Sequence, residues 1–172
     1  MKLNRRHFIS LSLVATAGAV YYFKGKKVTL FDDKTQIILA TAYHLYPASP
    51  LGFGIQELDL TSYLAFVLED ERIAKEDRDY LLRGGTWIEE QAHEDFKKSF
   101  LILTVNEKER LLQNIITFKW GENYINYLFT YIFEAIFSAP IYGSNIEKIG
   151  WQWSGHNPGF PQPKKVEDII YG

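Results

Sequence analysis

The chain contains no cysteine, and this absence excludes several kinds of site. Without thiols it can form no disulfide, ligate no iron–sulfur cluster by thiolate, attach no haem covalently and offer no thiol nucleophile. Its stability must come from packing instead. Aromatic residues make up 16% of the chain and include four Trp, and each aromatic side chain can bury a large apolar area. We therefore expect a domain with an aromatic-rich core.

Positive charge is scarce outside the N-terminus. Six of the 19 Lys and Arg lie in the first 27 residues, which contain no Asp or Glu. Residues 28–172 therefore carry thirteen basic and twenty-one acidic side chains, a net charge of −8. Phosphate binding needs clustered cations, so we expect no nucleic acid partner. This part of the chain is long enough for one domain with a hydrophobic core.

Patterns of catalytic residues are also missing. No Ser/His/Asp spacing, phosphate-binding glycine loop or pair of catalytic carboxylates stands out. Glu90 and His93 form an E-x-x-H unit, but di-iron bundles need two such units and two further carboxylates, and the chain has one copy. The residues therefore indicate a protein that is not an enzyme. An exported helical enzyme with a metal at Glu90 and His93 is the alternative.

The N-terminus has the pattern of a targeting signal. Arg5 and Arg6 precede Phe8, an apolar run extends from Leu11 to Phe23, and three lysines follow it. This order is typical of a twin-arginine export signal, which carries proteins that have already folded. The run is shorter than the roughly 20 residues that span a bilayer comfortably. We expect residues 1–27 to be such a signal, with a short N-terminal membrane anchor as the alternative.

Apolar residues recur at helical spacing through residues 28–172. The expected helices begin near Lys34 and near Asp59 or Thr61, run from about Ala74 to Phe100, follow Thr104, and run from Tyr124 to Phe137. No segment shows clear strand alternation. The sequence therefore predicts an all-α fold, a single domain of five to six helices.

Three local patterns refine this prediction. Thr104 and Glu107 have capping-box spacing. The pair Gly84-Gly85 predicts a kink, a break or a close helix approach inside the third helix. The segment from Tyr124 to Phe137 is apolar on nearly all sides, which is typical of a buried helix, and we expect it to be the central core helix, with a junction at Trp120-Gly121.

The last thirty residues differ in character. Residues 140–163 contain four Gly, four Pro and four aromatic residues. Long irregular segments are uncommon in compact domains and tend to be functional, and aromatic residues are enriched at interfaces. We expect an extended partner-binding tail, and His156 is the histidine most suited to meet a partner. The alternative is a tail that packs on its own core.

Several short motifs recur together along the chain. They are the Arg5-Arg6 leader, the Pro50-Leu51-Gly52 loop, Tyr63-Leu64, Trp87 with Ala92 and Phe96, Arg110-Leu111-Leu112, Tyr142-Gly143-Ser144-Asn145, Gly150-Trp151 and Gly155-His156-Asn157-Pro158-Gly159. Together they resemble the gluconate 2-dehydrogenase subunit 3 family, the small (gamma) subunit of membrane-associated flavoprotein sugar dehydrogenases. Family members often have Gly where this chain has Ser144. If that position requires a positive φ, Ser adds a steric cost.

The resemblance implies that this chain has a non-catalytic role. In the family, an FAD-containing catalytic subunit of the glucose–methanol–choline (GMC) oxidoreductase type commonly lacks its own signal. The small subunit binds it in the cytoplasm, carries it through the twin-arginine translocase and stays as a stabilising subunit, and a multihaem cytochrome c often takes the electrons.

For this chain the resemblance implies no cofactor of its own, FAD in the partner, and a location in the periplasm at the inner membrane. The residues expected to contact the catalytic subunit are Tyr142, Gly143, Asn145, Trp151, Trp153 and His156. A membrane-anchored scaffold or chaperone unrelated to flavoproteins is a further alternative.

Overall fold

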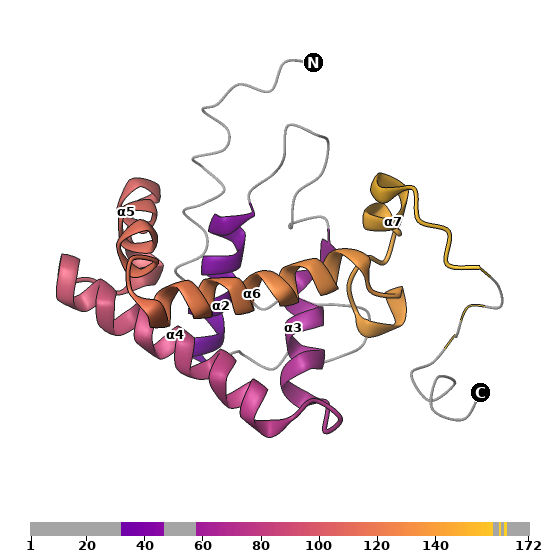
Figure 1. The fold of residues 1–172 in the computed structure, drawn as a ribbon, viewed down its shortest axis with the longest axis horizontal. Helices are drawn as coiled ribbons and strands as arrows, with labels where there is room; N and C mark the ends of the chain where they lie inside the picture. The colour runs from indigo at the N-terminus through magenta and orange to yellow at the C-terminus, as the bar shows by residue number, and fades with distance from the viewer. Residues whose placement is uncertain (1–31, 47–57, 160–161, 163, 165–172) are drawn as a thin grey trace, which may run out of the picture. The chain divides into compact units, whose positions relative to one another are not determined.

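The computed structural model describes residues 32–46, 58–159, 162 and 164. Within these residues the chain forms α-helices and two short 3₁₀ helices and no strand, which confirms the all-α prediction (Figure 1). In chain order the elements are α2 (Asp33–Leu45), α3 (Leu60–Glu69), α4 (Lys75–Phe96), η2 (Phe100–Ile102), α5 (Val105–Ile115), α6 (Lys119–Phe137), η3 (Pro140–Tyr142) and α7 (Ile149–Ser154). The expected leader and the Pro50-Leu51-Gly52 loop lie outside the described residues. No helix of the described part is both long and apolar enough to cross a bilayer.

Side-chain caps begin two of the helices. The Asp59 carboxylate accepts hydrogen bonds from the Ser62 backbone N, at 3.2 Å, and from the Ser62 hydroxyl, at 2.7 Å, at the start of α3. The predicted capping box opens α5: Thr104 Oγ1 accepts from Glu107 N at 3.3 Å, and the Glu107 carboxylate accepts from Thr104 N at 2.8 Å. These bonds satisfy amide groups that have no partner inside the helix.

The third predicted helix ends earlier than its apolar spacing suggests. Lys97 adopts a left-handed conformation with φ 57°, which ends α4 after Phe96. The chain then turns back, and the Glu89 carboxylate accepts a hydrogen bond from Phe100 N at 2.8 Å. Phe100 is fully buried, but it belongs to η2 rather than to α4.

The Gly84-Gly85 pair marks a close helix approach. Helix α4 runs through both residues without a break. A Cβ added at Gly84 would lie 1.7 Å from Cε2 of Tyr124, and one added at Gly85 would lie 2.7 Å from the Lys34 carbonyl oxygen. The two glycines therefore let α4 pack tightly against a ring of α6 on one side and the backbone of α2 on the other.

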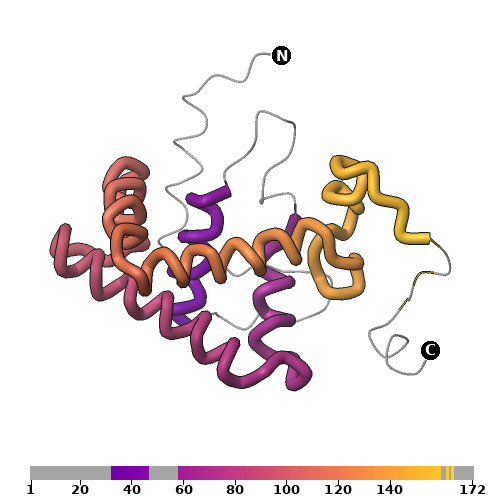
Figure 2. Tube along the Cα trace, in the orientation of Figure 1, coloured from indigo at the N-terminus to yellow at the C-terminus, as the bar shows by residue number. Residues whose placement is uncertain are grey.

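Helix α6 crosses α2, α3 and α4, and α7 lies beside its C-terminal end (Figure 2). The expected junction at Trp120-Gly121 is wrong, because α6 begins at Lys119 and includes both residues. A Cβ at Gly121 would lie 2.0 Å from the Ile115 carbonyl oxygen. This glycine therefore serves the tight passage from α5 into α6 rather than ending a helix.

The expectation that α6 is buried on all sides is also wrong. Leu128, Ile132 and Ile136 lie in the core, whereas Phe133 and Phe137 are 49% and 43% exposed. The helix has one face that packs on α2, α3 and α4 and a second apolar face that these helices leave uncovered.

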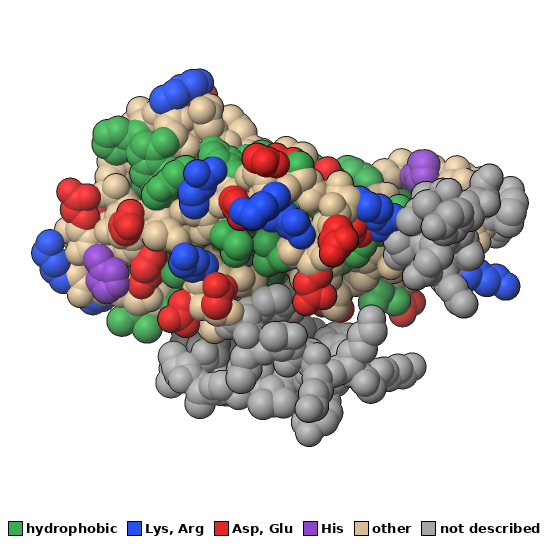
Figure 3. Space-filling view, turned by 90° about the horizontal axis from the view of Figure 1, so that it is seen from below, with side chains coloured by type: hydrophobic (Ala, Val, Ile, Leu, Met, Phe, Trp, Pro, Cys, Tyr) green, Lys and Arg blue, Asp and Glu red, His purple; other side chains and the backbone are tan. Residues whose placement is uncertain are grey.

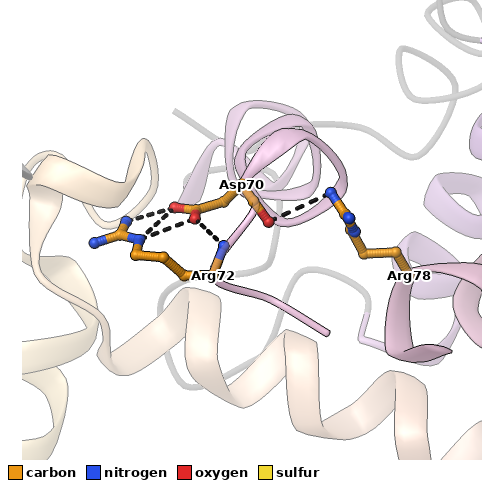
Figure 4. A network of polar contacts seen from close by, with 3 residues as sticks. All are labelled: Asp70, Arg72 and Arg78. Carbon is orange, nitrogen blue, oxygen red and sulfur yellow. Dashed lines mark hydrogen bonds and ion pairs between the residues drawn. The ribbon is translucent and has the colours of Figure 1, made fainter. Parts of the chain in front are cut away.

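The turn between α3 and α4 is fixed by Asp70 (Figure 4). Its carboxylate accepts hydrogen bonds from Arg72 Nε and from the Arg72 backbone N, both at 2.9 Å. Its carbonyl oxygen accepts from Arg78 Nη1 at 3.4 Å. The hydrogen bond from Arg72 lowers the pKa of Asp70 from 3.8 to about 2, so this carboxylate stays ionised and keeps the turn closed in mild acid.

Candidate partner interface

The C-terminal segment packs on the domain through two short helices. Within residues 140–159, η3 and α7 are helical and the rest is irregular. Asn145 is buried with φ 52° and makes four hydrogen bonds. Its backbone N donates to Leu58 O at 3.2 Å, and its backbone O accepts from Lys148 N at 2.8 Å. Its side-chain amide N donates to Ser138 O at 3.1 Å, and its side-chain O accepts from Gly150 N at 2.9 Å. Asn145 therefore fastens the segment to α6, to the start of α7 and to the residues before α3.

Ser144, at which the resemblance implied a possible steric cost, does not have a left-handed backbone. The left-handed positions of this turn are Gly143, with φ 94°, and Asn145, and Ser144 is not among them. Its hydroxyl is buried and donates to the Ala135 carbonyl oxygen. The condition for a steric cost at Ser144 is therefore not met, and its side chain adds a hydrogen bond to α6 that Gly could not make.

The six residues predicted to contact a partner divide into buried and accessible ones. Trp151 is only 6% exposed and its indole Nε1 donates to the Phe137 carbonyl oxygen at 2.7 Å. Trp151 and Asn145 thus lie inside the domain. Trp153 and His156 are exposed, and Tyr142 and Gly143 are partly so. The role of all six in partner binding stays a prediction, and the accessible ones are those in a position to fulfil it.

A row of exposed and partly exposed aromatic rings, which we call the aromatic ridge, runs along the uncovered face of α6. It consists of Phe129, Phe133, Phe137 and Trp153. Ring centroids are 6.1 Å apart from Phe129 to Phe133, 6.5 Å from Phe133 to Phe137 and 6.4 Å from Phe137 to Trp153. Spacing by four residues places the three phenylalanines on one stripe of the helix, and α7 adds Trp153, which is 49% exposed.

Two hollows lie beside Phe137. The first hollow has a volume of about 310 Å³ and is lined by Tyr63, Phe66, Glu134, Phe137, Ser138 and Tyr142. The second hollow has a volume of about 510 Å³ and is lined by Phe137, Ser154, Gly155, His156 and Asn157. Because Phe137 borders both, the ridge and the hollows form one continuous surface of rings and depressions.

The first hollow has few polar groups. The Tyr63 hydroxyl donates to Glu134 Oε2 at 2.8 Å. Burial, aided by the neighbouring Glu134 carboxylate, raises the pKa of Tyr63 above its usual value, so the phenol stays protonated. Ser138 Oγ is buried and has no hydrogen-bond partner within the described residues.

Beyond Lys119, which opens α6 and pairs with Glu122, the charged side chains along the ridge are all acidic. Residues 120–147 contain Glu122, Glu134 and Glu147 and no Lys or Arg. Figure 3 shows one face of the molecule, on which acidic and basic side chains intermingle and hydrophobic side chains are also exposed.

Other exposed hydrophobic side chains lie in η2 and at the two ends of α5. They are Ile102, Val105, Ile116 and Phe118.

The E-x-x-H residues do not form a ligand set in the described part of the chain. His93 Nε2 lies 3.2 Å from Glu89 Oε1, so its carboxylate neighbour is Glu89 rather than Glu90. The Glu89 carboxylate also accepts a hydrogen bond from Phe100 N. The described residues contain no group of three or more His, Cys, Asp or Glu side chains that could hold a metal ion.

The sequence did not distinguish the aromatic ridge from the core. Phe129, Phe133 and Phe137 are as apolar as the buried residues beside them on α6, and we expected them inside. The available signal was that α6 has more apolar positions than a single helix face can hold, which leaves a second stripe to be covered by something else.

Comparison with known proteins identifies the family. The family model described as gluconate 2-dehydrogenase subunit 3 matches residues 32–159, from the start of α2 to just beyond α7. No curated protein and no solved structure matches the chain. Because the family model covers well over half of the 172 residues, the chain belongs to the gluconate 2-dehydrogenase subunit 3 family.

Proposed function

We propose that the chain is the non-catalytic small subunit of a periplasmic flavoprotein dehydrogenase and that it binds the FAD-containing GMC-type subunit through the aromatic ridge. Membership of the family makes it a subunit of a dehydrogenase complex, which implies partner subunits. The observation that carries the proposal is the aromatic ridge, because exposed rings bordering hollows are typical of the central part of a protein interface.

The same proposal covers export. In it, the small subunit binds its folded partner in the cytoplasm and takes it through the twin-arginine translocase, led by Arg5 and Arg6. The complex then stays in the periplasm at the inner membrane, where a multihaem cytochrome c subunit accepts the electrons. The lack of cysteine supports placing any covalently attached haem on another subunit.

Purification of the tagged full-length chain from native membranes tests the proposal. We expect a second, larger chain and flavin absorbance in the eluate. The variant Phe133→Ser should lose both, because it removes a ring from the centre of the ridge. Phe118→Ser is the matched control, since Phe118 is 48% exposed, close to the 49% of Phe133, but lies at the start of α6. A colourless single chain from the wild type would overturn the proposal and favour an unrelated scaffold.

A further inference from the structure

The first hollow combines aromatic walls with one carboxylate. Phe66 and Tyr142 lie with ring centroids 5.1 Å apart, and Tyr63 lies 6.2 Å from Phe66. Glu134 brings the only charged side chain among the described lining residues. Aromatic faces around a carboxylate are the chemistry that binds organic cations, because the ring faces and the carboxylate both attract positive charge.

A buried hydroxyl in the same hollow lacks a partner. Ser138 Oγ is the one buried side-chain polar atom of the described residues without a hydrogen bond. Such atoms are rare, because burying them unpaired is unfavourable. The Glu134 carboxylate accepts one hydrogen bond from Tyr63 and retains lone pairs for others. The hollow therefore offers acceptors for a ligand that brings several N–H donors.

A guanidinium group fits these features better than an ammonium group. It is planar, carries five N–H donors and stacks on aromatic faces. One such contact already exists at the edge of the hollow, where Arg72 lies over the Phe66 ring at 5.9 Å from its centroid. Arg72 itself is bonded to Asp70 in the turn before α4.

The charge of the first hollow, which comes from Glu134, favours a different chain over a second copy of this one. Pairing two copies through this surface would bring the like-charged Glu134 carboxylates of the two copies into the same contact, which is unfavourable. A partner with a basic group at this point would instead complement it. Membership of the family implies partner subunits, one of which can bring such a group.

We propose that the first hollow binds an arginine side chain of the flavin-bearing subunit, with the guanidinium donating to Glu134 and Ser138 Oγ and lying against the aromatic rings that line the hollow. The identity of the partner rests on the proposed function, whereas the class of ligand rests on the hollow alone. Glu134 is then the residue that makes the first hollow specific for a cationic side chain.

Affinity for the flavin-bearing subunit tests the inference. Glu134→Gln keeps the size of the side chain and an oxygen that accepts from Tyr63, so the fold is retained. We expect it to weaken the complex about tenfold or more, measured by titrating the purified catalytic subunit, because a charged hydrogen bond is lost. Glu122→Gln, on the same helix and paired with Lys119, should have no effect. Equal affinities for the two variants would overturn the inference.

A direct titration separates this inference from the proposed function. The full-length chain is titrated with N-acetylargininamide, and aromatic resonances are followed by NMR, with N-acetyllysinamide and NaCl as controls. We expect saturable shifts at Tyr142 and Phe66 with the arginine compound, and weaker binding in Glu134→Gln and Ser138→Ala. Shifts that do not saturate, or that are the same in Glu134→Gln, would overturn the arginine site. A wild-type chain that captures no flavin-bearing subunit would overturn the proposed function instead.

Discussion

At the scale of single residues, Gly84 shows how little space separates α4 from α6. The Tyr124 ring lies directly over its Cα, and the Tyr124 hydroxyl donates to the Leu81 carbonyl oxygen at 3.2 Å. The hydroxyl bond fixes the ring, so the ring cannot move aside without losing that bond. Burial raises the pKa of Tyr124, which keeps the phenol protonated as a donor.

Gly84→Ala should therefore destabilise the domain. Helix propensity alone would favour Ala by about 1 kcal/mol, but overpacking of this kind costs about 1–3 kcal/mol. Urea unfolding of the full-length chain measures the difference, with the exposed neighbour Arg83→Ala as control. A Gly84→Ala protein as stable as the wild type would show that Tyr124 can be displaced freely.

Asn145 allows a second test at this scale, because it is both left-handed and hydrogen-bonded. Asn145→Ala would leave the buried Gly150 N and the partly buried Ser138 O without these partners and should lower the free energy of unfolding by about 1–3 kcal/mol. Asn145→Gly relieves the left-handed backbone but also loses the bonds, so it should recover only part of the loss. Thermal unfolding of the free chain gives both values. Unchanged stability in both variants would favour a role for Asn145 in partner contact alone.

At the scale of the element, α6 has a buried stripe beside an exposed one, and the proposed function assigns partner binding to the exposed stripe. Ile132 is fully buried and Phe133 is half exposed, although they are neighbours in the chain. We expect Ile132→Ala to cost about 2–5 kcal/mol and Phe133→Ala about 1 kcal/mol or less, mainly from the lost ring contacts. Chemical denaturation of the two variants checks this order, and equal losses would mean that Phe133 belongs to the core.

Helix α5 should make stability depend on pH through its capping box. Hydrogen bonds from Lys98 and from Thr104 lower the pKa of Glu107 from 4.5 to about 2. The ionised form is favoured in the folded state, so its contribution is present above pH 4.5 and is lost as pH falls toward 2. Glu107→Gln keeps the capping geometry but cannot titrate.

The measurement is stability against pH for the wild type and Glu107→Gln. Between pH 4.5 and 2 the wild type should lose more stability than the variant. Part of the slope should remain in both, because the pKa of Asp70 is also lowered to about 2. Parallel curves would show that Glu107 gains no stability from its contacts.

Elements were more predictable from the sequence than surfaces. The helices follow from apolar spacing and from Thr104 and Glu107, which are local signals. The inclusion of Gly121 in α6 was not predicted, because glycine is common at helix ends. The close Ile115 carbonyl oxygen shows why a residue without a side chain is needed there. The aromatic ridge was missed because burial of a phenylalanine depends on which helices cover it, and that is not a local property.

At the scale of the whole molecule, the sequence did not separate the accessible residues of the C-terminal segment from the buried ones. The predicted contact residues Trp153 and His156 are accessible, but the tail motif as a whole was predicted from its composition, which cannot tell a surface ring from one packed inside. Trp151 and Trp153 show the limit, since they lie two residues apart on α7 with opposite burial.

Export should require the arginine pair and should affect two chains at once. Replacing Arg5 and Arg6 by Lys keeps the charge of the N-terminus but removes the pair that marks the twin-arginine route. We expect both the small subunit and the flavin-bearing subunit to stay in the cytoplasm, as measured by cell fractionation and flavin content. Lys2→Arg serves as the control. Normal export of the flavin-bearing subunit in the double variant would mean that it does not depend on this chain.

The contact between Trp87 and Trp120 gives the domain an optical signature. The two indoles meet edge to face with centroids 5.8 Å apart, and Tyr80 and Tyr124 touch Trp87 at 5.7 and 6.4 Å. Indole transitions at this separation couple as excitons and produce a circular dichroism couplet that overlaps the helix signal. Loss of the couplet would report the separation of α4 from α6 independently of helix content, so the packing of this domain can be followed without a label.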